Sequence, residues 1–392
     1  MLKTIAEVQK QRRIAIIGGG PGGLVLALVL RNHGIPSVIY EREVAGTYAH
    51  RGGSLDIHEE SGQWALAEAG LYDQFQAVAR YEGEDFRLMD KTGTIYMDEA
   101  AEADEKGGRP EIDRGLLCEM LLNALNSKDI HYGHKLVRAV PLANGQHTLY
   151  FENGHTDTVD LVVGADGAFS RIRPLLTDCA AEYTGISMIE LTIDAALHPD
   201  LAAFNARGKM FGLGDCKAIM GQLNGDGKIK VYLCFRSDRE WLDHCGIPFH
   251  EPEQAKRQLL GLFADWDDSL KNYIRYAEEA LLPRRIYKLP VGLTWASKPG
   301  VTLIGDAAHL MSPFAGEGVN LAMRDAAELA LSLVRHDDIH KAVKVYEENM
   351  YAYSSESAKE SDDNLELLFS GNAAAELKNK FDQLYSAQNV QI

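Results

Sequence analysis

The pattern of apolar and polar positions predicts an α/β unit at the start of the chain. Residues 13–17 (Arg-Ile-Ala-Ile-Ile) are a short β-branched run, which is typical of a buried parallel strand. A glycine cluster follows, and then an apolar helix from about Gly22 to Asn32. A second strand is expected at Ser37–Tyr40. This strand–helix–strand order predicts a nucleotide-binding βαβ unit.

Later segments predict how the rest of the chain is organised. Leu161–Gly164 and Val301–Gly305 are two more buried-strand signals, each followed by a glycine-containing turn. Between them, from roughly 180 to 285, apolar runs such as Lys228–Phe235 lack following helices, which favours an antiparallel sheet. We therefore expect an α/β fold with a Rossmann-like domain, an inserted domain built on an antiparallel sheet, and a long C-terminal helix. The expected boundaries are 1–178 with 285–345, 179–284, and 346–392.

The glycine cluster has the spacing of a phosphate-binding turn. Gly18, Gly20 and Gly23 form G-x-G-x-x-G between the first strand and the helix. The first glycine permits the tight turn, the second lets the backbone approach a pyrophosphate, and the third permits close helix–strand packing. Glu41 ends the second strand and supplies the carboxylate expected on a ribose hydroxyl pair. An acid there favours FAD or NAD over NADP as the bound dinucleotide.

Two further segments resemble the fingerprints of flavoprotein aromatic hydroxylases. Asp160–Arg173 matches the family's Asp-Gly segment, and Val301–Asn320 matches its Gly-Asp segment. The resemblance implies that the protein binds FAD, that Asp166 lies against the dinucleotide, and that Asp306 binds the ribityl hydroxyls. It also implies that the turn and helix start after Asp306 lie against the flavin ring, through Pro313, Gly316, Gly318, Val319 and Asn320.

Within that class, the strings Gly52–His58 and Pro110–Arg114 look most like the tetracycline-degrading monooxygenases of the TetX type. The likeness runs over nearly the whole chain. It implies four more FAD contacts, at Arg42, Arg51, Asp56 and Arg114. One departure concerns Glu317, which stands where relatives usually carry glutamine. Because a carboxylate near the flavin would disfavour its negatively charged reduced form, we expect the Glu317 side chain to point away from the flavin.

The substrate side departs further from the TetX pattern. By spacing, Glu190 stands at a glutamine, Lys209 at an arginine, and Lys230 near a histidine of those enzymes. Met210 and Phe314 are candidates for an apolar wall, although a role in the core is an equal alternative for each. A changed hydrogen-bonding pattern alters which substrate is accepted. Tetracycline therefore stays one hypothesis for the substrate.

Composition narrows the classes of partner. The chain has 392 residues and a net charge of −17, which argues against nucleic acid and anionic membranes. Five widely spaced cysteines favour neither a disulfide framework nor a metal site. Met1 to Arg13 has no apolar stretch of signal-peptide length. These features predict a cytoplasmic monomer that acts on a small molecule.

The number of nucleotide-binding motifs in the sequence distinguishes between classes of flavoenzyme. No second G-x-G-x-x-G follows a strand, which disfavours monooxygenases with two nucleotide domains. The four tryptophans are isolated, so the W-x-W signature of flavin halogenases is absent. The leading hypothesis is a single-component monooxygenase that uses FAD, transient NADPH or NADH, and O2. A reductase of the geranylgeranyl-reductase kind and a non-catalytic flavin-containing binder remain as alternatives.

Overall fold

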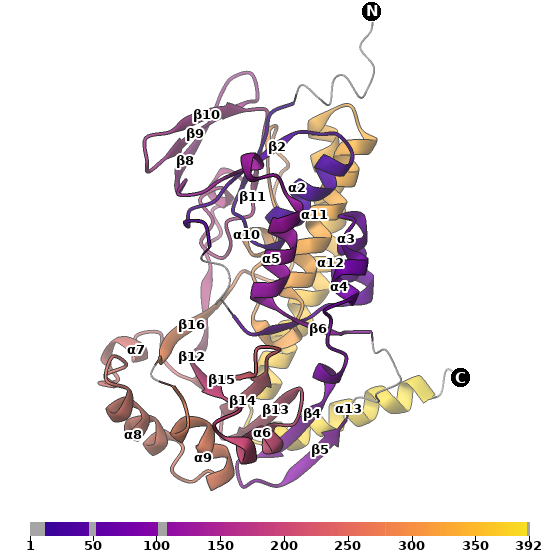
Figure 1. Ribbon diagram of the computed structural model, residues 1–392. Helices are drawn as coiled ribbons and strands as arrows, with labels where there is room; N and C mark the ends of the chain where they lie inside the picture. Colours follow the sequence, from indigo (N-terminus) through magenta and orange to yellow (C-terminus); the bar gives the residue numbers. More distant parts are fainter. Residues whose placement is uncertain (1–11, 47–51, 101–107, 279, 390–392) are drawn as a thin grey trace, which may run out of the picture. The chain divides into compact units, whose positions relative to one another are not determined.

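The computed structural model describes residues 12–46, 52–100, 108–278 and 280–389 (Figure 1). The chain divides into two compact units, each described here by itself. Unit 1 comprises 1–79, 114–182 and 287–361, and unit 2 comprises 80–113, 183–286 and 362–392. The sequence-based boundaries placed 80–113 in the first domain. The structure assigns this segment to unit 2 because two of its strands extend the sheet of that unit.

Unit 1 is built on a five-stranded parallel sheet in the order β17-β11-β1-β2-β7. Its strands are β1 (Ile14–Ile17), β2 (Ser37–Tyr40), β7 (Ile130–His131), β11 (Leu161–Gly164) and β17 (Val301–Leu303). β1, β11 and β17 are buried along their whole length, as their β-branched and apolar sequences predict. The strand order reverses direction at β1. In sheets of this kind, ligands bind at the carboxyl ends of the strands around such a switch point.

Helices cover this sheet and bring distant segments together. α2 (Pro21–Asn32) packs between α11 (Gly318–Arg335) and α5 (Arg114–Ala124) (Figure 1). The contact with α11 is close: a Cβ added at Gly22 would lie 2.7 Å from the Ala322 carbonyl oxygen. Shorter helices of unit 1 are η2 (Glu59–Gln63), α3 (Trp64–Glu68), α4 (Tyr72–Gln76), η4 (Ser127–Asp129), η5 (Arg173–Leu175), α10 (Asp306–His309) and η6 (Pro313–Ala315).

The remaining strands of unit 1 lie outside the parallel sheet. β8 (Leu136–Pro141), β9 (His147–Phe151) and β10 (Thr156–Val159) form a three-stranded antiparallel sheet. The short strand β3 (Ser54–Asp56) precedes the π-helical turn η2.

Unit 2 is built on a seven-stranded sheet in the order β16-β12-β15-β14-β13-β4-β5. All its neighbouring strands with a defined register are antiparallel except β13 and β4, which run parallel. The expected antiparallel layer is confirmed. Its strands are β4 (Phe86–Asp90), β5 (Ile95–Glu99), β12 (Glu182–Asp194), β13 (Lys209–Gly214), β14 (Lys217–Leu223), β15 (Lys228–Arg236) and β16 (Leu282–Lys288).

The core of unit 2 lies on one face of this sheet, beneath α8 (Pro252–Leu262) and α9 (Asp268–Arg275). Isoleucine, leucine and valine from alternate positions of β12 and β15 fill it. The smaller elements are η3 (Glu82–Glu84), β6 (Glu111–Asp113), α6 (Pro199–Asn205) and α7 (Trp241–His244).

The C-terminal segment forms two helices where the sequence suggested one. α12 (Ile339–Leu368) ends shortly before Gly371, and α13 (Ala373–Asn389) follows. Within unit 2, α13 packs against β4, β5 and β13.

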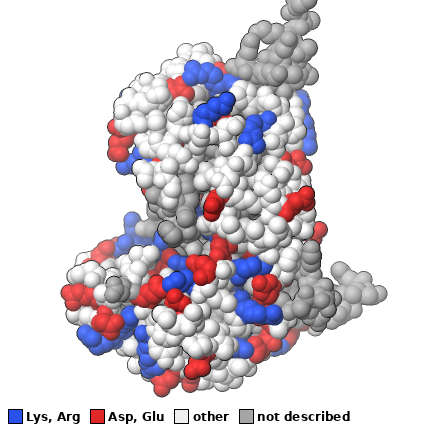
Figure 2. Space-filling model, in the orientation of Figure 1, with Lys and Arg blue, Asp and Glu red and all other residues white. Residues whose placement is uncertain are grey.

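Some whole-molecule properties bear on function. No helix within the described ranges is long and apolar enough to cross a membrane. The residues that the structure places contain no cluster of three metal-ligating side chains, and all five cysteines are free thiols. Figure 2 shows acidic and basic side chains interspersed over the face in view, as on an ordinary solvated surface.

Candidate functional site

The glycine turn after β1 has the geometry expected of a phosphate-binding turn. Gly18 has φ +113°, and a Cβ there would lie 2.3 Å from the Ala165 carbonyl oxygen. A Cβ at Gly23 would lie 2.1 Å from the Gly18 carbonyl oxygen. These two glycines therefore permit the tight turn and the close packing of α2 on it. Gly20 differs, since a Cβ there meets no atom within 4 Å. The open space lies at the N-cap of α2, where backbone N–H groups favour an anion.

A pair of alanine substitutions separates these roles. Gly23→Ala should destabilise the fold, because the new Cβ meets backbone. Gly20→Ala should leave the unfolding transition unchanged, because Gly20 has φ −74° and open space, yet weaken FAD binding by blocking approach of the pyrophosphate. Thermal unfolding of the apoprotein and FAD titration measure the two effects. Equal FAD affinity in Gly20→Ala and wild type would contradict this placement of the pyrophosphate.

Glu41 lies buried at the end of β2, beside the glycine turn. Its Oε2 accepts a hydrogen bond of 2.6 Å from the Gly19 N–H, and its Oε1 accepts one of 2.8 Å from the Glu43 N–H. Each carboxylate oxygen has a second lone pair, so the group can still accept hydrogen bonds from a ribose. The neighbouring Arg42 is exposed and pairs with Glu43 at 3.4 Å.

The Asp-Gly segment after β11 folds into a capped turn. The Arg171 N–H donates to Asp166 Oδ2 at 2.7 Å, and Ser170 Oγ accepts from the N–H groups of Ile172 and Arg173, each at 3.0 Å. Desolvation raises the pKa of Asp166, although hydrogen bonds from Ser170 and Arg171 act in the opposite direction. Asp166 Oδ1 is buried and accepts no hydrogen bond from the described residues. A buried acceptor of this kind fits a ligand hydroxyl.

Three separated turns meet at the carboxyl end of the sheet. Gly18 packs on Ala165 and Asp166, which joins the first two turns. The Arg173 guanidinium donates to the carbonyl oxygens of Ala307 (3.1 Å) and Asp306 (3.4 Å), which joins the second and third. The three turns therefore lie together within unit 1.

Asp306 begins α10 directly after β17 and Gly305. Its side chain is exposed, although the protein around it raises its pKa by desolvation. The cations Arg114 and Arg173 and the nearby His309 oppose that rise. An accessible carboxylate beside an anion-binding helix start fits the polyhydroxy chain of FAD.

A buried polar cluster holds the Gly305–Asp306 turn. Asp325 Oδ2 accepts hydrogen bonds of 2.7 Å from both the Gly305 N–H and His309 Nε2, and Asp325 Oδ1 accepts one of 2.6 Å from the Tyr353 hydroxyl. Asp325 is fully buried. Gly305 has φ +60°, a conformation that this hydrogen bond helps to fix. His309, Asp325 and Tyr353 were not predicted from the sequence, because only the fold brings these helices together.

The turn after α10 leads into the N-terminus of α11. Gly316 adopts the left-handed conformation (φ +72°), and a Cβ at Gly318 would lie 3.9 Å from Asp306 Oδ1. The backbone of Pro313, Gly318 and Val319 can therefore follow Asp306 along a bound dinucleotide. Asn320 has a different role from the expected cofactor contact. Its buried amide donates to the carbonyl oxygens of Asp56 and Gly316 and accepts from the His58 N–H, so it braces the turn.

Glu317 does not point to solvent. Its side chain is 15% exposed, and its Oε1 lies 3.2 Å from Nδ1 of the fully buried His58. The Glu317 carboxylate therefore lies within ion-pair distance of a buried histidine.

Arg51 and Arg114 are the two other arginines expected to contact FAD. The Arg114 N–H donates to the Gly53 carbonyl oxygen at 3.2 Å, and its aliphatic chain packs against Gly52, where an added Cβ would lie 2.8 Å from Arg114 Cδ. Arg51 lies outside the described residues.

In unit 2, the face of the sheet opposite the core is polar. Lys209, Gln222 and Lys230 occupy paired positions on β13, β14 and β15, so their side chains share this face. Lys209 Nζ lies 3.2 Å from the buried carboxylate of Glu111, and Lys230 Nζ donates to Thr192 Oγ1 at 3.0 Å. Gln222 and Glu111 were not predicted from the sequence as members of this face.

Glu190 lies on the same face, two positions along β12 from Thr192. It is 9% exposed at its side chain and accepts a hydrogen bond of 3.0 Å from Arg284 Nε, with Lys230 Nζ at 3.8 Å. Each lysine on this face therefore lies near a carboxylate of the same unit.

One apolar wall candidate lies on the wrong face. Met210 is fully buried in the core beneath α8 and α9, because it alternates with Lys209 along β13. We therefore remove Met210 from the substrate candidates. Phe314 lies in η6 of unit 1 and is half-buried.

The described site fits a flavin dinucleotide, and comparison with known proteins identifies the family. The family model of an FAD binding domain matches residues 11–211 and 294–341, more than half of the chain. The monooxygenase asqM of Emericella nidulans is 30% identical, over 93% of this chain and 97% of that protein. The chain belongs to this family of FAD-dependent monooxygenases.

Solved structures confirm the fold. HpxO of Klebsiella pneumoniae, complexed with FAD and uric acid, is 20% identical to this chain. The superposition covers 96% of this chain and 93% of HpxO, with a TM-score of 0.78. The tetracycline destructase Tet(51) is 22% identical, and its superposition covers 95% of this chain and 96% of Tet(51), with a TM-score of 0.71. The likeness is thus to flavoprotein hydroxylases broadly, without particular closeness to the tetracycline-degrading branch.

Proposed function

We propose that this FAD-dependent monooxygenase uses NADPH or NADH to insert one oxygen atom of O2 into a small aromatic or polycyclic substrate. One observation carries the proposal: the turns at Gly18–Gly23, Asp166 and Asp306 meet around an accessible carboxylate and an open helix N-terminus. Unit 2 adds a polar sheet face that can bind a small molecule. We propose that the protein acts as a monomer in the cytoplasm, without a nucleic-acid or membrane partner.

Each part of unit 1 has a role in holding FAD. Glu41 accepts hydrogen bonds from the ribose, the N-terminal amides of α2 bind the pyrophosphate, and Asp306 accepts from the ribityl hydroxyls. The Gly318 and Val319 amides at the start of α11 favour negative charge on the ring. When bound, FAD supplies the chemistry by accepting a hydride from the nicotinamide and activating O2. The protein orients the two reactants and excludes water.

The polar side chains on the sheet face of unit 2 indicate the chemical class of the substrate. Glu190, Lys209 and Lys230 present acceptor and donor groups, and each already has a partner of opposite charge. A neutral or zwitterionic ring system with several hydroxyl or carbonyl groups exchanges hydrogen bonds with such a face without leaving a buried charge unpaired. Polyhydroxylated phenols and tetracyclines meet this description, and uric acid meets it in its neutral form. Tetracycline is one candidate among them.

A turnover screen tests the proposal. The holoenzyme is incubated with tetracycline, a phenol or uric acid, and consumption of NADPH and of NADH is followed together with product mass under labelled O2. A gain of one labelled oxygen atom supports the proposal. A reduced product without that atom would favour a reductase instead, and tight binding without NADPH consumption would favour a binder.

A variant pair then tests the substrate face. Glu190→Gln should raise KM for the productive substrate and leave the FAD content unchanged, because Glu190 lies in unit 2. Lys128→Ala, at an exposed position of η4, is the matched control. Unchanged KM in Glu190→Gln would remove this face from substrate binding.

A further inference from the structure

A buried imidazole lies between two carboxylates beside the N-terminus of α11. The His58 side chain is fully buried. Its Nε2 lies 3.4 Å from Asp56 Oδ2, and its Nδ1 lies 3.2 Å from Glu317 Oε1. The two carboxylate side chains are only 22% and 15% exposed, so water screens these interactions weakly.

The two carboxylates affect which protonation state of the His58 imidazole is favoured. A neutral imidazole carries one N–H and can offer it to only one of the two carboxylates. The imidazolium carries a proton on each nitrogen and is attracted to both carboxylates, although the Nδ1 contact with Glu317 is an ion pair at 3.2 Å without hydrogen-bond geometry. With that proton the three groups together have a net charge of −1, and without it they have −2.

This triad of charges lies at the end of the proposed dinucleotide path. Gly318, the first residue of α11, approaches Asp306 Oδ1, and a Cβ at Gly316 would lie 3.1 Å from the Asp56 carboxylate. Asn320 ties the backbone of β3 to the same turn. The path from Glu41 through Gly20 and Asp306 therefore continues to the turn that carries Glu317.

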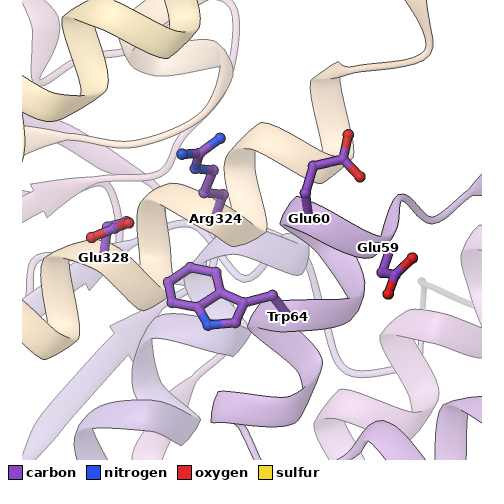
Figure 3. A pocket seen from close by; sticks show the side chains of 5 residues that line it. All are labelled: Glu59, Glu60, Trp64, Arg324 and Glu328. Carbon is purple, nitrogen blue, oxygen red and sulfur yellow. The ribbon is translucent and has the colours of Figure 1, made fainter. Parts of the chain in front are cut away.

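Other charged residues near His58 have separate surroundings. Glu59 and Glu60 follow it in η2, but they line an open pocket of about 500 Å³ together with Trp64, Arg324 and Glu328 (Figure 3). Arg114 and Asp306 lie on the cofactor side of the turn, and desolvation of Asp306 is partly offset by Arg114. Asp56 at the end of β3 and Glu317 at the N-cap of α11 each lie within ion-pair distance of the imidazole.

We propose that His58 carries the proton that offsets the charge of Glu317, and that this proton sets how readily bound FAD takes up negative charge. The inference rests on the proposed function, since it places the flavin ring beside the start of α11. Loss of the proton at alkaline pH leaves Glu317 uncompensated and disfavours the reduced flavin. His58 is thereby a charge-setting and positioning residue.

Spectroscopic redox titration of the FAD-loaded protein tests this inference without a substrate. In the couple followed, oxidised FAD takes up two electrons from a mediator and one proton from solvent to give the anionic reduced form. Wild type, His58→Gln and Glu317→Gln are compared from about pH 5.5 to pH 9.5, a range that spans histidine titration. FAD affinity and apoprotein unfolding are measured for each variant first.

The expected signature depends on pH. At the acidic end, His58→Gln should lower the ratio of reduced to oxidised FAD about tenfold at fixed applied potential, or about 30 mV for a two-electron couple. At the alkaline end it should match wild type, because the wild-type histidine has lost its proton. Glu317→Gln should raise the ratio of reduced to oxidised FAD at every pH. Because glutamine has nearly the same shape as glutamate, this variant tests the inference even if His58→Gln does not fold.

A structural role alone would not give this pH-dependent difference. Potentials that are equal at both ends, or displaced equally at both, would overturn the inference while leaving FAD binding intact. A wild-type protein that takes up no FAD would instead defeat the proposed function itself. The two failures are thus distinguishable.

Discussion

Replacing Asp306 by alanine is expected to weaken FAD binding by roughly 10- to 100-fold. The reason is the loss of charge-assisted hydrogen bonds to the ribityl hydroxyls, which typically contribute about 1.5–3 kcal/mol. The Asp306 side chain is exposed, and none of the hydrogen bonds described above that hold the fold involves its carboxylate. The free energy of unfolding of the apoprotein should therefore equal that of wild type. Fluorescence titration of the apoprotein with FAD measures the effect.

The control is Asp178→Ala, which removes an exposed carboxylate from the same unit. It should retain wild-type affinity for FAD. Normal flavin content in Asp306→Ala would show that the ribityl chain lies elsewhere.

Replacing Asp325 by alanine is expected to destabilise the protein by about 3–5 kcal/mol, the usual cost of breaking a buried ion pair by removing one partner. The change leaves His309, Tyr353 and the Gly305 N–H without their common acceptor. Tyr353→Phe is the matched control, because it removes one hydrogen bond and should cost about 1 kcal/mol. Urea unfolding of both apoproteins measures the difference. Similar losses in the two variants would indicate that Asp325 carries no charge in the fold.

The same cluster predicts a pH dependence of stability. Desolvation alone would lower the pKa of His309, but the charge and hydrogen bond of Asp325 outweigh it and raise that pKa. A raised histidine pKa stabilises the fold fully below the unfolded value of about 6.5, and the contribution is lost as pH rises through the folded pKa. The stability advantage of wild type over His309→Gln should therefore shrink with increasing pH.

Much of unit 1 could be predicted because local patterns determine it. The strands Ile14–Ile17 and Leu161–Gly164 are apolar runs followed by turns that contain glycine, and Ser37–Tyr40 is a short run ending in Glu41; each forms where the pattern places it. The glycines with positive φ or no room for a Cβ mark the turns directly. What local pattern cannot show is which helices meet, so the contacts of Asp325 and His58 had to come from the fold.

Two errors in unit 2 had signals in the sequence. Lys209 and Met210 are adjacent in a strand, so their side chains must point to opposite faces, and both could not line one pocket. Phe86–Asp90 and Ile95–Glu99 flank a short turn containing Gly93, which is a hairpin signal. Their assignment to unit 2 depends on pairing with β13, a contact distant in sequence.

Glu317 shows a different limit. Its substitution for glutamine is visible in the sequence, and avoidance of the flavin was the simplest expectation. The structure places its carboxylate 3.2 Å from Nδ1 of His58, a residue 259 positions earlier in the chain, and no local pattern indicates this contact.

A crystal structure of the protein grown with FAD tests the central claim most directly. We expect one dinucleotide, with its ribose at Glu41, its pyrophosphate at Gly20, and its ribityl chain at Asp306. FAD bound elsewhere, or in contact with only one of the three turns, would contradict the account.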